Sequence, residues 1–287
     1  MSNFQKRVLT AVIGGILMIG ILIMGREFLL ATLCALSYIG YFELTKAVGV
    51  HTNDKNVNSL EIVGLITITA WYAVLELSYY KVIETNPLAW GVVVLLLGLV
   101  GYMTVYVFSF PKYNASQVMA AVFSMIYCPI MLSFIYLIRH LEYGLYLVWM
   151  IFVCSWMCDI FAYLVGIKIG KHRMAPVLSP KKSIEGAVGG VVGSAVIGSL
   201  YAIFILTPQI TNANSTKLVV LIVIISMIGA FISMVGDLAA SAIKRNHDIK
   251  DYGKLLPGHG GIMDRFDSVI FVAPLVYILS VVFLLYI

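Results

Sequence analysis

Long apolar stretches alternate with short polar segments along most of the chain. About 20 apolar residues in a helix are needed to cross ~30 Å of hydrocarbon, and nine stretches approach that length. They lie near residues 8–25, 28–48, 62–80, 88–110, 118–138, 143–167, 187–207, 218–236 and 269–287. The ten-residue alternation of barrel strands does not occur, so only helices can satisfy the backbone in lipid. The pattern predicts an all-α polytopic membrane protein with about nine transmembrane helices.

The composition excludes most other classes of protein. Hydrophobic residues make up 61% of the 287 positions and charged residues 11%, against roughly 45–50% and 25% in soluble domains. So few charges cannot coat a soluble fold, support a disordered chain or bind nucleic acid. The four cysteines, Cys34, Cys128, Cys154 and Cys158, lie in apolar stretches without a CxxC pair, which suggests neither disulfides nor a zinc site.

The distribution of Lys and Arg predicts the orientation. With nine spans and a cytoplasmic N-terminus, 15 of the 19 basic residues fall on the inner side and four on the outer side, as the positive-inside rule requires. We therefore expect a multi-pass protein of the cell membrane. We expect residues 1–140 to form about five N-terminal spans, and residues 141–287 to form a C-terminal region of about four spans with two charged cytoplasmic loops.

These two loops hold nearly half of all charged residues. Residues 168–186 carry five basic residues and one acid, while residues 237–267 carry five of each sign. A net charge of +4 in the first loop suits phosphate. A plain anion-binding patch would not contain five carboxylates, so the second loop suggests a hard cation such as Mg²⁺ that bridges carboxylate and phosphate oxygens.

Three carboxylates are expected at the inner side of the membrane. Asp237 ends the eighth span, Asp264 opens the ninth, and Asp159 lies in the inner third of the sixth. An intramembrane carboxylate costs about 2.5–3.5 kcal/mol on insertion scales and is by default a candidate functional residue. Alternatives stay open: Asp237 and Asp264 could be interfacial helix-flanking residues, and Asp159 could pair with Lys168 or Arg173.

The stretch 179–186 (SPKKSIEG) combines two lysines with a helix start. Lys181 and Lys182 alone would read as a positive-inside anchor, but Ser183-Ile184-Glu185 resembles a helix N-terminus, where backbone amides favour phosphate. Glycine and serine then recur at four-residue spacings from 186 to 198, which predicts close helix packing. A GxxxxGK[ST] motif is not found, so this is not a Walker-type nucleotide site.

Several other polar residues are weaker candidates for a functional role. His259-Gly260-Gly261 could present amides to an anion, and we expect His259 to orient substrate rather than abstract a proton, because a phosphate monoester is already ionised near neutral pH. Glu43, Lys46 and Glu76 are better explained by snorkelling or local pairing than by catalysis.

Residues 241–267 (SAIKRNHDIKDYGKLLPGHGGIMDRFD) closely resemble the signature of the phosphatidate cytidylyltransferase family, also called CDP-diacylglycerol synthases. The stretch that contains Asp159, Tyr163, Gly166, Gly170 and Lys171, followed by 179–186, resembles the second motif of that family. Ser183 stands where relatives usually have Thr, which retains the hydroxyl. The resemblance is detailed only in the C-terminal half; residues 1–140 share a hydropathy pattern alone.

The resemblance implies a Mg²⁺-dependent nucleotidyltransferase of phospholipid biosynthesis, which converts CTP and phosphatidate to CDP-diacylglycerol and pyrophosphate at the cytoplasmic face. One or two Mg²⁺ ions are then expected on Asp237, Asp264 and Asp267. The catalytic groups are expected to be Asp237, Asp264, Lys244, Arg245, Arg265 and His259. Substrate contacts are expected from Ser179, Lys181, Lys182, Ser183, Glu185, Lys250, Asp251, Gly260, Gly261 and Asp159.

Other functions remain open from the residues themselves. A related enzyme could use CTP on another lipid phosphate or a polyprenol, because its headgroup chemistry would be the same. An ion-coupled transporter would place charges across several spans and interrupt matching helices, whereas the charges here lie on one side. A structural scaffold would leave the motif unexplained. CTP, phosphatidate and the bilayer are the expected partners, and the resemblance also favours a homodimer.

Overall fold

The computed structural model describes residues 3–51, 56–84, 86–210, 214–255 and 260–286, with side chains from Ile13 onward. Within these residues, eight helices are long and apolar enough to cross a membrane, and residues 13–24 add a shorter apolar helix. The expected all-α membrane fold is thus confirmed at this level. The eight spans cover residues 26–47, 59–79, 87–108, 115–139, 144–169, 184–206, 215–246 and 263–286.

The chain divides into two compact units. Unit 1 comprises residues 1–136 and 246–265, and unit 2 comprises residues 137–245 and 266–287. The boundary at residue 140, which the sequence suggested between two groups of spans, stays a prediction. Residues 246–265, however, join the N-terminal unit, although the sequence prediction grouped them with the C-terminal region.

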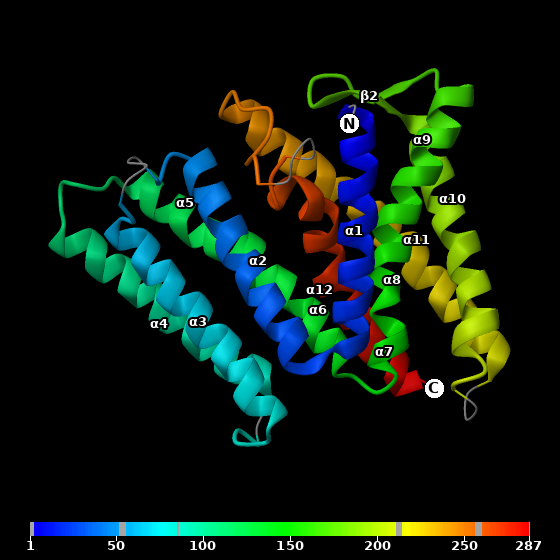
Figure 1. The fold of residues 1–287 in the computed structure, drawn as a ribbon, viewed down its shortest axis with the longest axis horizontal. Coiled ribbons are helices and arrows are strands. Elements are labelled where there is room, and N and C mark those ends of the chain that lie inside the picture. Colours follow the sequence, from blue (N-terminus) through cyan, green and yellow to red (C-terminus); the bar gives the residue numbers. More distant parts are fainter. Residues whose placement is uncertain (1–2, 52–55, 85, 211–213, 256–259, 287) are drawn as a thin grey trace. The chain divides into compact units, whose positions relative to one another are not determined.

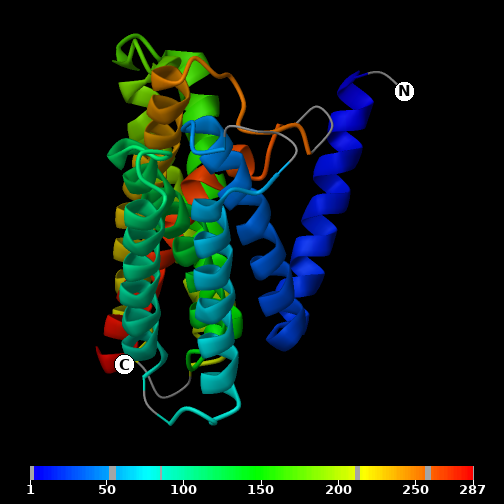
Figure 2. The same cartoon turned by 90° about the vertical axis from the view of Figure 1, so that its left-hand side faces the viewer.

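Unit 1 is built from antiparallel helices (Figure 1). Its elements are α1 (Asn3–Met24), α2 (Arg26–Ala47), α3 (Ser59–Tyr79), α4 (Pro87–Phe108), α5 (Ala115–Met125), the π-helical turn η1 (Ile126–Ile130) and most of α6 (Met131–Arg139). Helices α1 and α2 meet at Gly25 and diverge from there (Figure 2). Gly25 has a φ of +62°, a left-handed conformation in which a side chain would be strained.

Polar side chains start several of these helices. Asn58 and Glu61 form a reciprocal capping box at α3, and Asn114 and Gln117 form another at α5. Asn86 accepts a hydrogen bond at the start of α4, ahead of Pro87. Each cap gives a partner to a backbone N–H that lacks one inside the helix, which fixes where the span begins.

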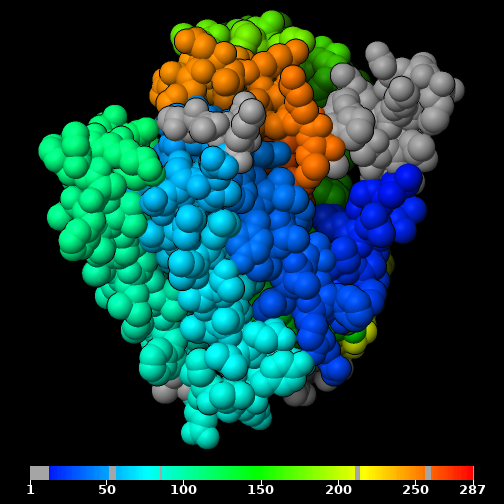
Figure 3. All heavy atoms as spheres, turned by 60° about the vertical axis from the view of Figure 1, so that its left-hand side comes forward, coloured from blue at the N-terminus to red at the C-terminus, as the bar shows by residue number. Residues whose placement is uncertain are grey.

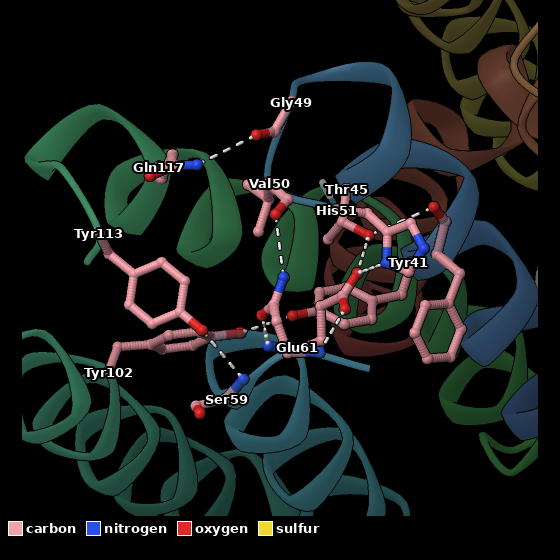
Figure 4. A network of polar contacts seen from close by, with 12 residues as sticks. Tyr41, Thr45, Gly49, Val50, His51, Ser59, Glu61, Tyr102, Tyr113 and Gln117 are labelled. Atoms are coloured by element: carbon pink, nitrogen blue, oxygen red, sulfur yellow. Dashed lines mark hydrogen bonds and ion pairs between the residues drawn. The ribbon is translucent and has the colours of Figure 1, made fainter. Parts of the chain in front are cut away.

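A buried polar network joins the C-terminal end of α2 to the start of α3 (Figure 4). The Glu61 side chain is fully buried, and its Oε1 accepts hydrogen bonds from Thr45 Oγ1 at 3.1 Å and pairs with His51 Nδ1 at 2.8 Å. Its Oε2 accepts the backbone N–H of Asn58 at 2.9 Å, and Asn58 Nδ2 donates to the carbonyl of Val50. Because these buried donors and acceptors form hydrogen bonds with one another in place of water, they fix the end of α2.

Unit 2 contains the remaining helices and a β-hairpin. Its elements are the end of α6, α7 (Gly144–Leu147), α8 (Trp149–Phe152), η2 (Val153–Met157), α9 (Cys158–Ile169), β1 (Arg173–Ala175), β2 (Ser179–Ser183), α10 (Ile184–Tyr201), η3 (Ala202–Leu206), α11 (Ser215–Asn246) and α12 (Met263–Tyr286), the last two except for their ends in unit 1. The antiparallel pair β1–β2 lies at the end of α9 and the start of α10 (Figure 1).

Helices α9 and α10 pack closely, as the glycine spacing predicted. A Cβ at Gly190 would lie 2.9 Å from the Cys158 carbonyl and sulfur, and one at Gly186 would lie 2.7 Å from the Ala162 carbonyl. Glycine therefore lets the two backbones approach each other. This close contact positions the hairpin between the two helices.

The Glu61 network generates a test of stability. Replacing Glu61 with Leu leaves Thr45, His51 and the Asn58 amide without their acceptor in a buried site. We expect the free energy of unfolding to fall by about 2–3 kcal/mol, seen as a lower thermal midpoint in detergent. The exposed Glu84→Gln is the matched control and should melt like the parent protein. An unchanged midpoint for Glu61→Leu would contradict the proposed stabilising role.

Candidate functional site

A cavity of about 600 Å³ opens in unit 2 between α9, the hairpin, α10 and α11. Its charged lining residues are Asp159, Arg173, Lys181 and Lys182. The rest of the wall is small or apolar. These residues are Ala162, Tyr163, Gly166, Ile167, Gly170, Met174, Ser183, Gly186, Ala187 and Met234. The cavity thus joins a basic region to an apolar wall, an arrangement that suits an amphiphile with an anionic head.

The hairpin brings the basic residues to this cavity. Glu185 fixes it to α10, because its carboxylate accepts the backbone N–H groups of Lys171 and His172 and pairs with His172 Nδ1 at 2.6 Å. Arg173 donates from Nη1 to the carbonyl of Lys181 across the strands. Glu185 therefore has a structural role here, and its predicted contact with substrate stays a prediction.

Ser183 starts α10 as the sequence predicted. Its Oγ accepts the backbone N–H of Gly186 at 3.1 Å, and its backbone is extended. The lysines at 181 and 182 consequently precede a helix N-terminus directly, where the helix dipole favours an anion. Ser179, also predicted to contact substrate, is the first residue of β2 and lies two residues before Lys181.

Lys182 and Asp237 form an ion pair within unit 2, with side chains 26% and 27% exposed. The charges of Lys182 and Asp237 both act on the carboxylate of Asp159. Within the part of the chain that the structure describes, no ion pair joins Asp159 to Lys168 or Arg173, the alternative that the sequence left open. Lys182 is thus paired with Asp237 of α11, and its charge also acts on Asp159 of α9.

Asp267 lies near Asp237. A Cβ at Gly236 would lie 2.9 Å from the Asp267 carbonyl, so α11 and α12 approach each other at this point. Asp267 Oδ1 accepts the backbone N–H of Ser268 at 2.8 Å, and the charges of Asp237, Lys244 and Asp159 act on its carboxylate. Unit 2 therefore gathers predicted carboxylates from three helices, α9, α11 and α12, together with Lys182 of β2 and Lys244 of α11.

Asp237 and Asp267 offer the carboxylate oxygens that a magnesium ion prefers as ligands. Among the described residues, no group of three or more His, Cys, Asp and Glu side chains is arranged to hold a metal. Mg²⁺ commonly uses one or two carboxylates and completes its octahedron with water and substrate phosphates. Asp237 and Asp267 supply such a pair, and Lys182 already compensates part of its charge.

The other predicted residues lie mainly in the 246–265 segment of unit 1. Asp264 Oδ2 accepts the backbone N–H groups of Tyr252 at 2.8 Å and Gly261 at 3.0 Å. Gly260 has a φ of +84°, which favours glycine. Lys250, Asp251 and Arg265 are exposed in this segment, and Arg245 is exposed on the last turn of α11 in unit 2. His259 lies outside the described residues.

The sequence interpretation missed the contacts that Glu43 makes within unit 1. Its carboxylate accepts the backbone N–H groups of Ile262 at 3.1 Å and Met263 at 2.9 Å, both in unit 1. The sequence suggested snorkelling or local pairing instead. An acid within an apolar helix was the available signal, but nothing in the local pattern identified partners more than 200 residues away.

Comparisons with known proteins identify the family to which this chain is similar. A model of the cytidylyltransferase family matches residues 5–283. A phosphatidate cytidylyltransferase of Bacillus subtilis (strain 168) is 30% identical over 284 residues, covering 99% of this chain and all of the relative. Proteins of the same name from Staphylococcus epidermidis (strain ATCC 35984) and Staphylococcus aureus (strain COL) are 32% and 33% identical, each over 96% of this chain and 99% of their own. The resemblance drawn from the motifs is confirmed.

The Lys182–Asp237 pair can be tested by a double-mutant cycle. Because both side chains are partly exposed, we expect a coupling of about 1 kcal/mol between Lys182→Met and Asp237→Asn. The measurement is the unfolding free energy in detergent for the parent, both single variants and the double variant. A matched cycle with exposed Lys181→Met should show coupling near zero. Equal coupling in both cycles would contradict a specific ion pair.

Proposed function

Because the chain belongs to the cytidylyltransferase family, we propose that it is a phosphatidate cytidylyltransferase acting at the cytoplasmic face of the cell membrane. Such an enzyme joins a lipid phosphate to the cytidylyl group of CTP and releases pyrophosphate. The observation that carries the proposal is the cavity of unit 2, where basic side chains and an apolar wall share one space. A membrane lipid with a phosphate headgroup matches this cavity, because it joins an anionic group to apolar chains.

The cavity suits the lipid substrate at both ends. Lys181, Lys182 and Arg173 can neutralise a phosphate, and the adjacent helix N-terminus adds backbone N–H donors. Ala162, Ala187 and other small or apolar residues leave room along the wall for the glycerol and the first part of the acyl chains. The charged head then lies at the interface while the tails stay in hydrocarbon.

The reaction requires two anions to approach each other. An oxygen of the phosphatidate phosphate attacks the α-phosphorus of CTP, and the bond from that phosphorus to the oxygen bridging to the β-phosphorus breaks. The negative charge of the displaced pyrophosphate grows as the bond breaks. Positioning and charge stabilisation dominate such transfers. Lys182 and Lys244 are half-buried cations beside the carboxylates of unit 2 and supply this stabilisation. Arg245 and Arg265 are retained as further proposed contributors on the strength of the sequence signature.

Asp237 and Asp267 are proposed to hold Mg²⁺. When bound, the ion would neutralise phosphate oxygens and act as a Lewis acid toward them. Asp264 is retained as a further proposed ligand on the strength of the sequence signature. Lys182, which pairs with Asp237, holds that carboxylate in place and is well situated to contact phosphate as well.

The first test removes a single carboxylate charge. Asp237→Asn and Asp264→Asn should each lower CDP-lipid formation by about 100-fold or more, because a lost charge contact in a polar transition state has this size of effect. Purified protein in detergent is supplied with CTP, phosphatidate and Mg²⁺, and the lipid product is counted.

Asp248→Asn is the matched control. Asp248 is exposed and has a φ of +53°, a conformation that Asn adopts readily, so activity should stay at the parent level. Appreciable turnover by Asp237→Asn or Asp264→Asn would contradict the role proposed for that carboxylate. A comparable loss of activity in Asp248→Asn would show that the effect is not specific to Asp237 and Asp264.

The second test fills the apolar wall. Ala187→Phe should raise the KM for phosphatidate about tenfold while the KM for CTP stays near the parent value, because the added ring occupies space assigned to the lipid. Val188→Phe, on the neighbouring exposed position, is the control and should leave both constants unchanged. A rise in the KM for CTP alone would show that the cavity takes the nucleotide instead.

A further inference from the structure

Glu43 lies one turn before the end of α2 and contacts the start of α12. Its two carboxylate oxygens accept the backbone N–H groups of Ile262 and Met263. The first N–H groups of a helix have no partner within the helix. A carboxylate also interacts favourably with the positive end of the helix dipole. Glu43 therefore caps α12 from another helix.

The segment is shaped around this carboxylate. A Cβ at Gly253 would overlap Glu43 Oε1, and a Cβ at Gly261 would overlap both of its oxygens. Met263 is fully buried, and its sulfur lies 3.5 Å from the position a Cβ would take at Gly40, one turn before Glu43 on α2. Glycine at 253 and 261 is thus needed for the close approach.

Asp264 belongs to the same arrangement. Its Oδ2 accepts the N–H groups of Tyr252 and Gly261, and Glu43 accepts the next two N–H groups along the chain, those of residues 262 and 263. Three successive amides are therefore held by two carboxylates. A change in the position of residues 262 and 263 would move the backbone that carries Asp264.

The helix that presents Glu43 is itself fixed. Thr45 and His51, at the C-terminal end of α2, bind the fully buried Glu61 of α3. Figure 3 shows residues 246–255, coloured orange, against the blue surface of α2. A positioning group is most effective on a rigid element whose own contacts restrict it. The end of α2 meets this condition.

We propose that Glu43 is a positioning residue for the reaction: it holds the N-terminus of α12 so that Asp264 and Arg265 are presented in one fixed orientation. Glu43 acts through the backbone of residues 262 and 263 and does not contact substrate. The inference rests on the proposed function, because the signature segment is assigned to catalysis there. It extends the functional machinery into the N-terminal half, where the sequence showed only a hydropathy pattern.

The test compares Glu43→Ala, Glu43→Gln and Glu43→Asp with Glu76→Gln. Glu76 accepts a hydrogen bond from Tyr136 and serves as a matched control in an apolar helix of the same unit. We expect kcat to fall about 30-fold in Glu43→Ala and less in Glu43→Gln and Glu43→Asp, which retain an acceptor. The KM for phosphatidate should stay near the parent value, because the described residues that line the cavity all belong to unit 2.

A second readout does not depend on activity. Trypsin can cleave after Lys250 and Lys254, which are exposed in the 246–255 segment, and Glu43→Ala should increase this cleavage several-fold while the thermal midpoint changes little. Gly261→Ala should produce the same increase, because its methyl group displaces the Glu43 carboxylate. Combining Gly261→Ala with Glu43→Ala should then add little.

Several results would overturn the proposal. Cleavage at the parent rate in Glu43→Ala would show that Glu43 does not hold the segment, whatever the activity. Faster cleavage with an unchanged kcat would show that holding the segment does not affect the reaction. An equal kcat loss in Glu76→Gln would also overturn it. Failure of the proposed function is seen separately, because the parent protein itself would then form no CDP-lipid.

Discussion

The structure depends on one constraint: a charged group among apolar helices must find donors or opposite charges within the protein. An unpaired charge there is costly, so each carboxylate determines which backbone and side-chain groups surround it. Glu61 is surrounded by Thr45, His51 and the Asn58 amide, and Asp237 is paired with Lys182. With only 11% charged residues, these few pairings determine much of the tertiary arrangement within each unit.

The same constraint applies to the cavity of unit 2. Small residues on α9 and α10 allow close packing, and the hairpin between these helices supplies Arg173, Lys181 and Lys182 to the cavity. Lys182 is stabilised by its ion pair with Asp237, and in the proposed function a substrate phosphate would replace part of that interaction. In the proposed function, the apolar wall beside the basic residues would keep acyl chains away from water. The same residues would thus determine, in the proposed function, both which substrate binds and where it lies in the membrane.

Hydropathy and motif spacing predicted a large part of this molecule. Long apolar stretches depend on composition alone, so the helical spans were readable, and Ser183 and the glycines of α10 were readable because caps and close packing have local signatures. The β-hairpin was missed because its strands, Arg173–Ala175 and Ser179–Ser183, are too short to show a period. The contacts of Glu43 with Ile262 and Met263 were missed because they join residues 219 and 220 positions apart, which no local pattern encodes.

The most direct test of the proposed reaction follows the fate of individual phosphates. Purified protein is incubated with phosphatidate, Mg²⁺ and CTP labelled at either the α- or the γ-phosphorus. Cytidylyl transfer predicts that the α-label enters the lipid fraction and that the γ-label is released as pyrophosphate. Appearance of the γ-label in lipid would instead show a kinase. Parallel incubations replace phosphatidate with another lipid phosphate or a polyprenyl phosphate, and labelling of one of these, with none of phosphatidate, would contradict the assigned substrate.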